Sequence, residues 1–115
     1  RAFAARLSRA QGLFATGKAA LMPSGSTTIA DLAQIAQACP VVLQIESHTA
    51  NTGPTAFNEQ LSGQRAEAIR SALHAYGISP ERLVPLGFGE HRPLANNSTF
   101  EGRNRNERIE IRIFR

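Results

Sequence analysis

The sequence predicts an α/β (α+β) sandwich in which two main helices pack on one face of a mixed β-sheet. Three observations support this fold class: β-branched runs typical of buried strands, two long stretches with apolar residues at helical spacing, and the alternation of these two patterns along the chain. The expected order is strand, helix, strand, helix, strand, strand. At 115 residues the chain is long enough for one hydrophobic core, and we interpret residues 1–115 as a single domain.

The first third of the chain is expected to contain the first main helix. Residues 1–10 carry apolar side chains at helical spacing and are interpreted as an N-terminal extension or short helix, followed by a strand at Gln11–Ala15. Ser24–Ala38 has an apolar stripe at helical spacing and begins with residues that cap helices well, so it is predicted to be the first main helix. Pro40 ends this helix because proline cannot donate a helical hydrogen bond.

The second helix and the remaining strands follow from the same signals. The β-branched run in Val41–Ser47 predicts a strand. An apolar face that ends at Tyr76 predicts a helix beginning at Asn58 or Ser62, with Gly77 as its C-terminal cap. The later expected elements are a strand at Leu83–Phe88, a polar loop with room for one helical turn at Asn96–Arg103, and an edge-type strand at Ile109, Ile111 and Ile113.

Composition and charge exclude several classes of function. The chain has 13 basic and 9 acidic residues, but one Tyr and no Trp, so it lacks the aromatic platform that single-stranded nucleic acids stack on. No apolar run approaches the ~20 residues that span a bilayer. Because the chain opens on Arg1 instead of Met, we interpret it as a fragment, with any membrane attachment in parts outside it. The C-terminal basic residues alternate with isoleucines, which predicts a solvated strand face: Arg103, Arg105, Arg108, Arg112 and Arg115.

The side chains that most often carry chemistry do not indicate an enzyme or a metalloprotein. Cys39 is expected to be a buried or half-buried inert thiol, with an intermolecular disulfide as the alternative. His48, His74 and His91 lack the spacing of metal ligands, so we expect neither a metal nor another cofactor. Glu46 is available as a general acid or base, but its alternation with an apolar neighbour is typical of a solvent-facing strand residue.

The polar stretch from Ser47 to Ala66 is the candidate binding site. It begins where the predicted second strand ends, the place where open α/β sheets usually bind ligands. Its loop consists of small hydrogen-bonding residues, and Arg65 lies one to two turns into the following helix, where it could face back toward the loop. A guanidinium beside small hydrogen-bonding groups suits a compact anion such as a carboxylate. The stretch therefore predicts recognition rather than catalysis.

Motifs spread over nearly the whole chain resemble a known family. In order, they are Phe14-Ala15-Thr16-Gly17-Lys18-Ala19-x-Leu21, His48-Thr49-x-Asn51-Thr52-Gly53, Phe57-Asn58-x-x-Leu61-Ser62-x-x-Arg65-Ala66, Gly77-Ile78-x-x-x-Arg82-Leu83, Gly87-Phe88-Gly89-Glu90-x-x-Pro93 and Asn106-x-Arg108-Ile109-Glu110-Ile111. With these residues in this order and spacing, the chain from Gly12 onward resembles the OmpA-like peptidoglycan-binding domain, the OmpA C-terminal domain family.

The resemblance implies a non-catalytic domain on the periplasmic side of the bacterial cell envelope. Such domains hold outer-membrane proteins, lipoproteins or flagellar stators to the cell wall by binding diaminopimelate in the peptidoglycan stem peptide. In the family's pattern, an Asp after the His-Thr pair takes the ligand's ammonium group and the helix Arg takes its carboxylate. Carried over to this sequence, the implied ligand-binding residues are Arg65, Asn58, Thr49, Ala50, Asn51, Thr52 and Arg108.

The sequence departs from the family's pattern at two of these positions. Ala50 stands where the family carries the Asp, and losing a partly desolvated ion pair typically costs ~2–5 kcal/mol of binding. Whether Ala50 is natural or engineered stays open. Glu107 stands where the family commonly carries an Arg. Either Glu107 supplies the missing negative charge from the opposite wall of the site, or it points to solvent and pairs with a nearby arginine.

The alternative function is that of a protein-interaction or dimerisation module. A degenerate domain with a weakened pocket could dock on other envelope proteins or on a second copy of itself. The candidate surfaces are the arginine face of the last strand and a face of the N-terminal segment that carries Phe3 and Leu7.

Overall fold

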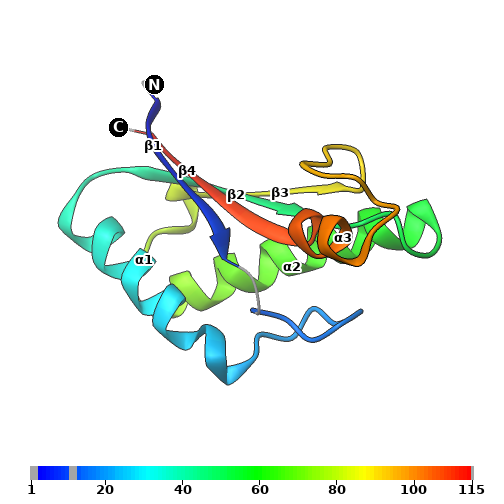
Figure 1. The fold of residues 1–115 in the computed structure, drawn as a ribbon. Helices are drawn as coiled ribbons and strands as arrows, with labels where there is room; N and C mark the ends of the chain where they lie inside the picture. The colour runs from blue at the N-terminus through cyan, green and yellow to red at the C-terminus, as the bar shows by residue number, and fades with distance from the viewer. Residues whose placement is uncertain (1–2, 11–12, 115) are drawn as a thin grey trace.

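The computed structural model describes residues 3–10 and 13–114, with the backbone alone described for 3–10. The strands are β1 (Phe3–Ala10), β2 (Val42–His48), β3 (Leu83–Gly89) and β4 (Arg108–Phe114), and the helices are α1 (Ser26–Ala38), α2 (Thr55–Ala75) and α3 (Phe100–Asn106), with 3-10 turns at Pro23–Gly25 and Pro80–Arg82. The described strands form one sheet in the order β1-β4-β2-β3, in which β2 and β3 are parallel and the other neighbours antiparallel. Both long helices lie on the same face of the sheet (Figure 1). The predicted fold class is therefore confirmed.

The N-terminal segment is a strand, so the short helix interpreted over residues 1–10 is wrong. The backbone of β1 pairs antiparallel with β4 and places Leu7 opposite Ile111. Alanine and arginine favour helices by only a few tenths of a kcal/mol per residue, roughly, which a hydrogen-bonded ladder along a neighbouring strand outweighs. The first strand of the predicted order exists, but it lies earlier in the chain than expected.

The segment that follows β1 is not the strand expected at Gln11–Ala15. Residues 11–12 lie outside the described residues, and the rest of the segment contributes an isolated bridge between Phe14 and Leu21. Leu13 is buried in the core beneath the sheet. The apolar residues of this segment therefore mark a packed loop.

Strand β4 is central, not the edge strand that the sequence predicts. It pairs with β1 on one side and β2 on the other, which places two neighbours against a strand expected to have one. Its isoleucines point to the helices as expected, but two charged side chains of the opposite face are not solvated, since Arg108 is 5% exposed and Glu110 is 4% exposed. The Arg112 side chain on the same face is 31% exposed. Arg115, the last member of the predicted basic face, lies outside the described residues.

Helix α2 is the central element of the helical layer. It begins at Thr55, directly after Pro54 and earlier than either expected start. Its C-terminal end is as predicted, because Gly77 adopts a positive φ of 93° that favours glycine and donates its backbone N–H to His74 O at 2.8 Å. Apolar side chains that are at most 1% exposed fill the space between the helices and the sheet: Ala33, Ala36, Leu43, Ile45, Ala66, Ile69, Leu73 and Ile111.

Helix α2 packs unusually close to β3 because glycines meet there. A Cβ atom added at Gly87 would lie 2.3 Å from the backbone N of Gly63, a separation that no real side chain tolerates. Just before this contact in α2, Ser62 Oγ accepts the backbone N–H of Gly89 at 2.9 Å. The helix and the strand ends are therefore fixed relative to each other where the loop after β2 begins.

Two expectations about the surface can be compared with the structure. Cys39 is exposed at the end of α1, so the expected buried or half-buried thiol is wrong. In the part of the chain that the structure describes, no helix is long and apolar enough to cross a membrane.

Candidate functional site

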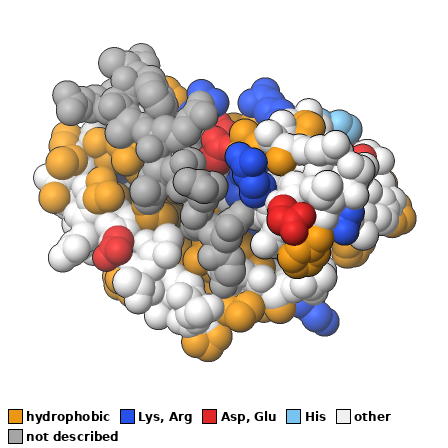
Figure 2. All heavy atoms as spheres, in the orientation of Figure 1, with side chains coloured by type: hydrophobic (Ala, Val, Ile, Leu, Met, Phe, Trp, Pro, Cys, Tyr) orange, Lys and Arg blue, Asp and Glu red, His pale blue; other side chains and the backbone are white. Residues whose placement is uncertain are grey.

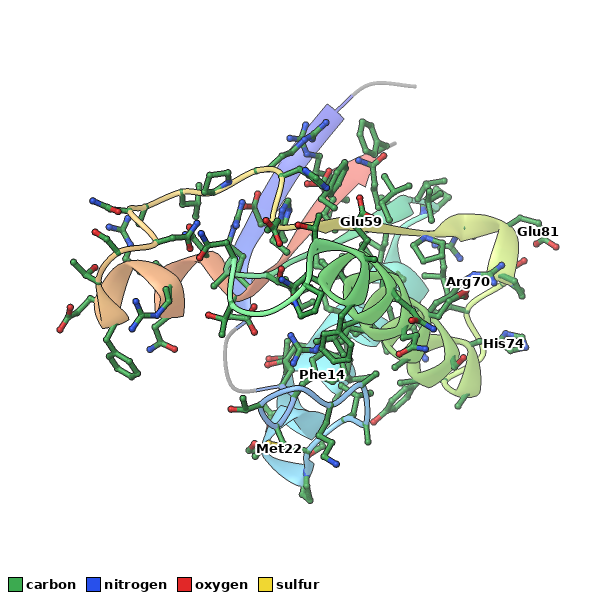
Figure 3. All side chains as sticks on the ribbon, turned by 90° about the vertical axis from the view of Figure 1, so that its right-hand side faces the viewer. Phe14, Met22, Glu59, Arg70, His74 and Glu81 are labelled. Atoms are coloured by element: carbon green, nitrogen blue, oxygen red, sulfur yellow. The ribbon has the colours of Figure 1, made fainter. Side chains whose placement is uncertain are left out.

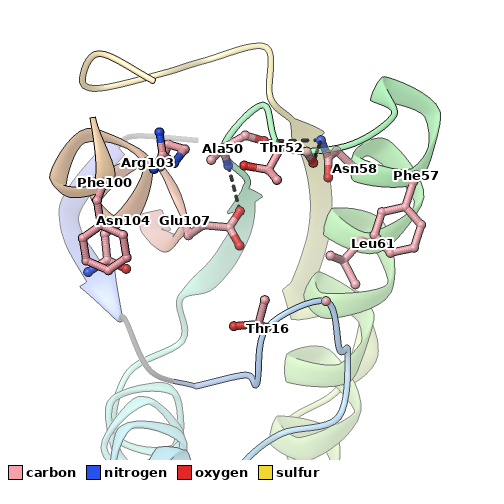
Figure 4. A pocket seen from close by; sticks show the side chains of 11 residues that line it. Thr16, Ala50, Thr52, Phe57, Asn58, Leu61, Phe100, Arg103, Asn104 and Glu107 are labelled. Carbon is pink, nitrogen blue, oxygen red and sulfur yellow. Dashed lines mark hydrogen bonds between the residues drawn. The ribbon is translucent and has the colours of Figure 1, made fainter. Parts of the chain in front are cut away.

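A pocket of about 360 Å³ opens between α2 and α3 at the end of β2. Figure 4 shows its walls: α2 lies on one side, α3 on the other, the loop after β2 above and the segment before α1 below. The side chains that line it include those of Thr16, Ala50, Thr52, Phe57, Asn58, Leu61, Phe100, Arg103, Asn104 and Glu107. Parts of the chain far apart in sequence therefore meet at one cavity.

The rim of the pocket is aromatic and exposed. Phe57 on α2 is 49% exposed and Phe100 on α3 is 69% exposed, while Leu61 is buried between them and the core. On the face seen in Figure 2, acidic and basic side chains lie close together over the region of α3, with apolar side chains exposed among them. Such a mixture of apolar walls and few charges is typical of small-ligand sites.

The loop after β2 is held in place by Asn58. Its side-chain amide donates to Thr52 O at 3.1 Å, to Glu90 Oε1 at 3.0 Å and, more weakly, to Ala50 O at 3.3 Å. Thr49 N–H donates to Gly89 O at 2.8 Å, which joins the loop to the end of β3. Asn58 thus lines the pocket while its donors are used to shape the loop.

Arg65 is buried behind the pocket and is absent from the described residues that line it. Its Nε donates to Lys18 O at 2.8 Å and its Nη2 to Ala15 O at 3.2 Å, so the guanidinium fixes the segment before α1 onto α2. The guanidinium also lies 5.2 Å from the centre of the Phe14 ring. Figure 3 shows Phe14 on that segment, next to α2.

Glu107 stands between Arg65 and the open pocket. One carboxylate oxygen, Oε1, accepts from Arg65 Nη1 at 3.3 Å, and the other, Oε2, accepts from the Ala50 backbone N–H at 2.7 Å. The side chain is 37% exposed, and Figure 4 shows its carboxylate reaching from the end of α3 into the space between the walls. Glu107 thus pairs with an arginine, as one interpretation held, but from the pocket wall.

The other sequence-predicted site residues do not all meet at this pocket. Thr52 lines it, but Thr49 is buried with its hydroxyl donating to Ala50 O at 2.8 Å, and Asn51 is an exposed loop residue. Arg108 is buried elsewhere: its Nη2 donates to Arg92 O at 3.0 Å, beyond the end of β3. The structure therefore brings together part of the set carried over from the family.

Sequence reasoning missed the contribution of α3. Phe100, Arg103 and Asn104 line the pocket together with Glu107, although most of this segment was expected to be loop. The signal was present, since these positions follow the i, i+3, i+4, i+7 spacing of one helix face. A cap was also present, because Thr99 Oγ1 accepts the Gly102 N–H at 2.9 Å.

The sheet face opposite the helices carries a separate polar cluster, which we call the sheet-face cluster. Its members are Glu46, His48, Arg108, Glu110 and Arg112. Arg108 Nε donates to Glu110 Oε2 at 2.7 Å, and Arg112 Nε lies 2.9 Å from Glu46 Oε2. Glu46 is 2% exposed, so the expectation of a solvent-facing carboxylate at this position is wrong.

His48 is a neutral member of the sheet-face cluster. Its ring stacks on Phe88 at 5.2 Å between centres. Burial lowers the pKa of His48 to about 4, and the neighbouring Arg108 guanidinium acts in the same direction against the carboxylates of Glu110 and Glu46. The imidazole therefore packs as an uncharged ring at neutral pH.

Comparison with known proteins identifies the family. The model of the OmpA family matches residues 13–107, and the chain therefore belongs to the OmpA family.

Individual relatives agree with this assignment. The chain is 37% identical over 105 residues to outer membrane protein A of Bordetella avium, covering 90% of this chain and 54% of the relative. It is 35% identical over 99 residues to the peptidoglycan-binding protein ArfA of Mycobacterium bovis, covering 85% of this chain and 30% of the relative. The chain thus spans little more than half of one of these proteins and less than a third of the other.

A solved structure shows the same fold. The cell wall anchor of the T6SS from Pseudomonas aeruginosa superposes with a TM-score of 0.84 at 25% sequence identity, covering 95% of this chain and 80% of that one. The relatives and neighbours are thus described as outer-membrane, peptidoglycan-binding and cell-wall-anchoring proteins.

Proposed function

We propose that this domain holds a larger envelope protein to the cell wall by binding the peptidoglycan stem peptide, without catalysis, in the pocket between α2 and α3. The main observation that supports this proposal is that residues from the family's motif segments line the pocket. Ala50 and Thr52 come from the first loop motif, Asn58 and Leu61 from the α2 motif, and Glu107 from the segment that leads into β4. The named function of ArfA, peptidoglycan binding, supports the same assignment.

The chemistry of the pocket favours recognition. Its walls offer apolar surface from Phe57, Leu61 and Phe100, which suits the aliphatic part of a diamino acid such as diaminopimelate. Ser62, a candidate nucleophile by residue type, instead donates its hydroxyl to Glu59 O at 2.9 Å within α2. We place this binding on the periplasmic side of the cell envelope, where the domain meets the stem peptide.

The proposal is tested by sedimentation with purified wall sacculi. Thr16 is exposed at the base of the pocket, so Thr16→Trp fills the cavity without removing a core contact. Ser71→Trp adds the same side chain on an exposed position of α2 outside the pocket and serves as the matched control. We expect the parent and Ser71→Trp to sediment with sacculi and Thr16→Trp to stay in solution.

Two results would overturn the proposal. Equal sedimentation of the two tryptophan variants would place wall binding outside this pocket. A parent domain that does not sediment but self-associates, or is captured by another envelope protein, would replace wall binding with the interaction-module alternative. Of the arginine face expected to serve that alternative, Arg108 is buried in the sheet-face cluster and the Arg112 side chain is 31% exposed. The Phe3 and Leu7 side chains lie outside the described residues.

A further inference from the structure

The strong hydrogen-bond donors at the head of the pocket are occupied by the chain itself. Arg65 Nη1 and the Ala50 backbone N–H form a receptor for one carboxylate, and the Glu107 carboxylate fills it with contacts of 3.3 Å and 2.7 Å. The remaining edges of the Arg65 guanidinium are used by Lys18 O and Ala15 O. A group that enters the pocket therefore meets the partly exposed oxygens of Glu107 before it meets Arg65.

The pocket is also lined by a cationic side chain from α3. Arg103 lies on α3, four residues before the C-cap residue Glu107, and lines the cavity. Its Nη1 donates to Asn97 O at 3.0 Å. In Figure 4 the Glu107 carboxylate reaches into the space between the walls, and the Arg103 guanidinium lies on the α3 side of that space. Both charges that line the pocket are thus supplied by α3 and the residue that caps its C-terminal end, while Arg65 of α2 lies behind Glu107.

We infer that Glu107 binds a primary ammonium group of the ligand and Arg103 its carboxylate, so that α3 and its C-terminal cap set both the charge preference and the orientation of the bound ligand. This inference rests on the proposed function, because it concerns the same pocket. A primary ammonium is the natural partner of a partly exposed carboxylate whose own hydrogen bonds hold it in place. The apolar walls formed by Phe57, Leu61 and Phe100 accept the aliphatic chain between the two charges.

Three probes of matched length test the inference by amide NMR titration. They are 6-aminohexanoate, which carries both charges, hexylamine, which carries the ammonium group alone, and hexanoate, which carries the carboxylate alone. We expect the parent domain to bind them in that order of decreasing affinity, with shifts at the pocket residues. Low ionic strength keeps the charge contributions measurable.

Charge-removing variants at Glu107 and Arg103 assign the two roles. Glu107→Gln is expected to weaken hexylamine roughly tenfold and to strengthen hexanoate, because Arg65 Nη1 loses its internal carboxylate. Arg103→Gln is expected to weaken 6-aminohexanoate and hexanoate while leaving hexylamine unchanged. Arg105→Gln, on an exposed position of the same helix outside the pocket, is the matched control and should bind as the parent does.

The inference is overturned if the parent binds hexanoate as tightly as hexylamine, if Glu107→Gln leaves their ratio unchanged, or if none of the three probes binds. Thermal unfolding of both glutamine variants verifies that they are folded, so that a lost signal reports on the site. The two proposals fail separately. Sacculus binding that depends on Thr16 but not on Glu107 removes this inference alone, whereas probe binding in the expected order without sacculus binding removes the wall-binding function alone.

Discussion

Two ion pairs of this domain each join an arginine to a glutamate, but they differ in how far the two side chains are buried. In the sheet-face cluster, the side chains of Arg108 and Glu110 are 3% and 6% exposed and meet at 2.7 Å. At the pocket, Arg65 is 6% exposed but Glu107 is 37% exposed, and they meet at 3.3 Å. A pair that is closed to solvent on both sides holds the fold. A pair with one open partner can exchange contacts with a ligand.

Of the changes to these two pairs, removal of the Glu110 carboxylate is expected to reduce stability most. Glu110→Ala leaves the buried Arg108 guanidinium without this carboxylate, and we expect the free energy of unfolding to fall by about 3–5 kcal/mol. Urea denaturation measures the change, with the exposed Glu101→Ala on α3 as the control that stays near the parent. A loss no larger for Glu110→Ala than for Glu101→Ala would mean that the sheet-face cluster does not hold the fold.

Acid should weaken the sheet-face cluster through His48. Because the pKa of His48 is lowered to about 4 in the folded state from 6.5, the unfolded state binds its proton first as pH falls. The contribution is fully present above pH 6.5 and is lost progressively toward pH 4, by up to about 3 kcal/mol. Urea denaturation across this range should show the slope in the parent and in the exposed-histidine control His91→Gln, and a smaller slope in His48→Gln. An equal dependence of the unfolding free energy on pH in all three proteins would contradict the attribution of this loss to His48.

A like charge placed beside Glu107 at the pocket is expected to have a smaller effect on the free energy of unfolding. Ala50→Asp places a carboxylate beside Glu107, whose Oε2 is 2.7 Å from the Ala50 N, and we expect a loss of about 1–2 kcal/mol in the free energy of unfolding. The double variant Ala50→Asp/Glu107→Arg should recover most of that loss. A double-mutant cycle in urea measures the coupling, and additive effects of the two substitutions would show that the side chains at these positions do not interact.

Local signals in the sequence predicted the parts of the fold that depend on neighbouring residues. The β-branched run of β2, the apolar face of α2 and the Gly77 cap each require only a few consecutive residues to recognise. Strand β1 was missed because its helical spacing is a local preference that pairing with β4, about 100 residues later, overrides.

The candidate site was predicted in part for the same reason. The loop after β2 and Asn58 follow from motifs along one segment, and the structure places Ala50, Thr52 and Asn58 at the pocket. The covering of Arg65 by Glu107 joins residues 42 positions apart. The alternation of arginines with isoleucines likewise gave no sign that Arg108 and Glu110 would be buried as a pair. Contacts between distant segments were therefore the part that the sequence pattern did not contain.

The most direct test is an amide NMR titration of the parent domain with a soluble, diaminopimelate-containing stem-peptide fragment. We expect saturable shifts at pocket residues, centred on Ala50, Thr52, Arg103 and Glu107, with the backbone of the sheet-face cluster unaffected. Shifts centred on the sheet-face cluster would contradict binding at the pocket. So would a titration in which neither the parent nor Thr16→Trp shows any shifts.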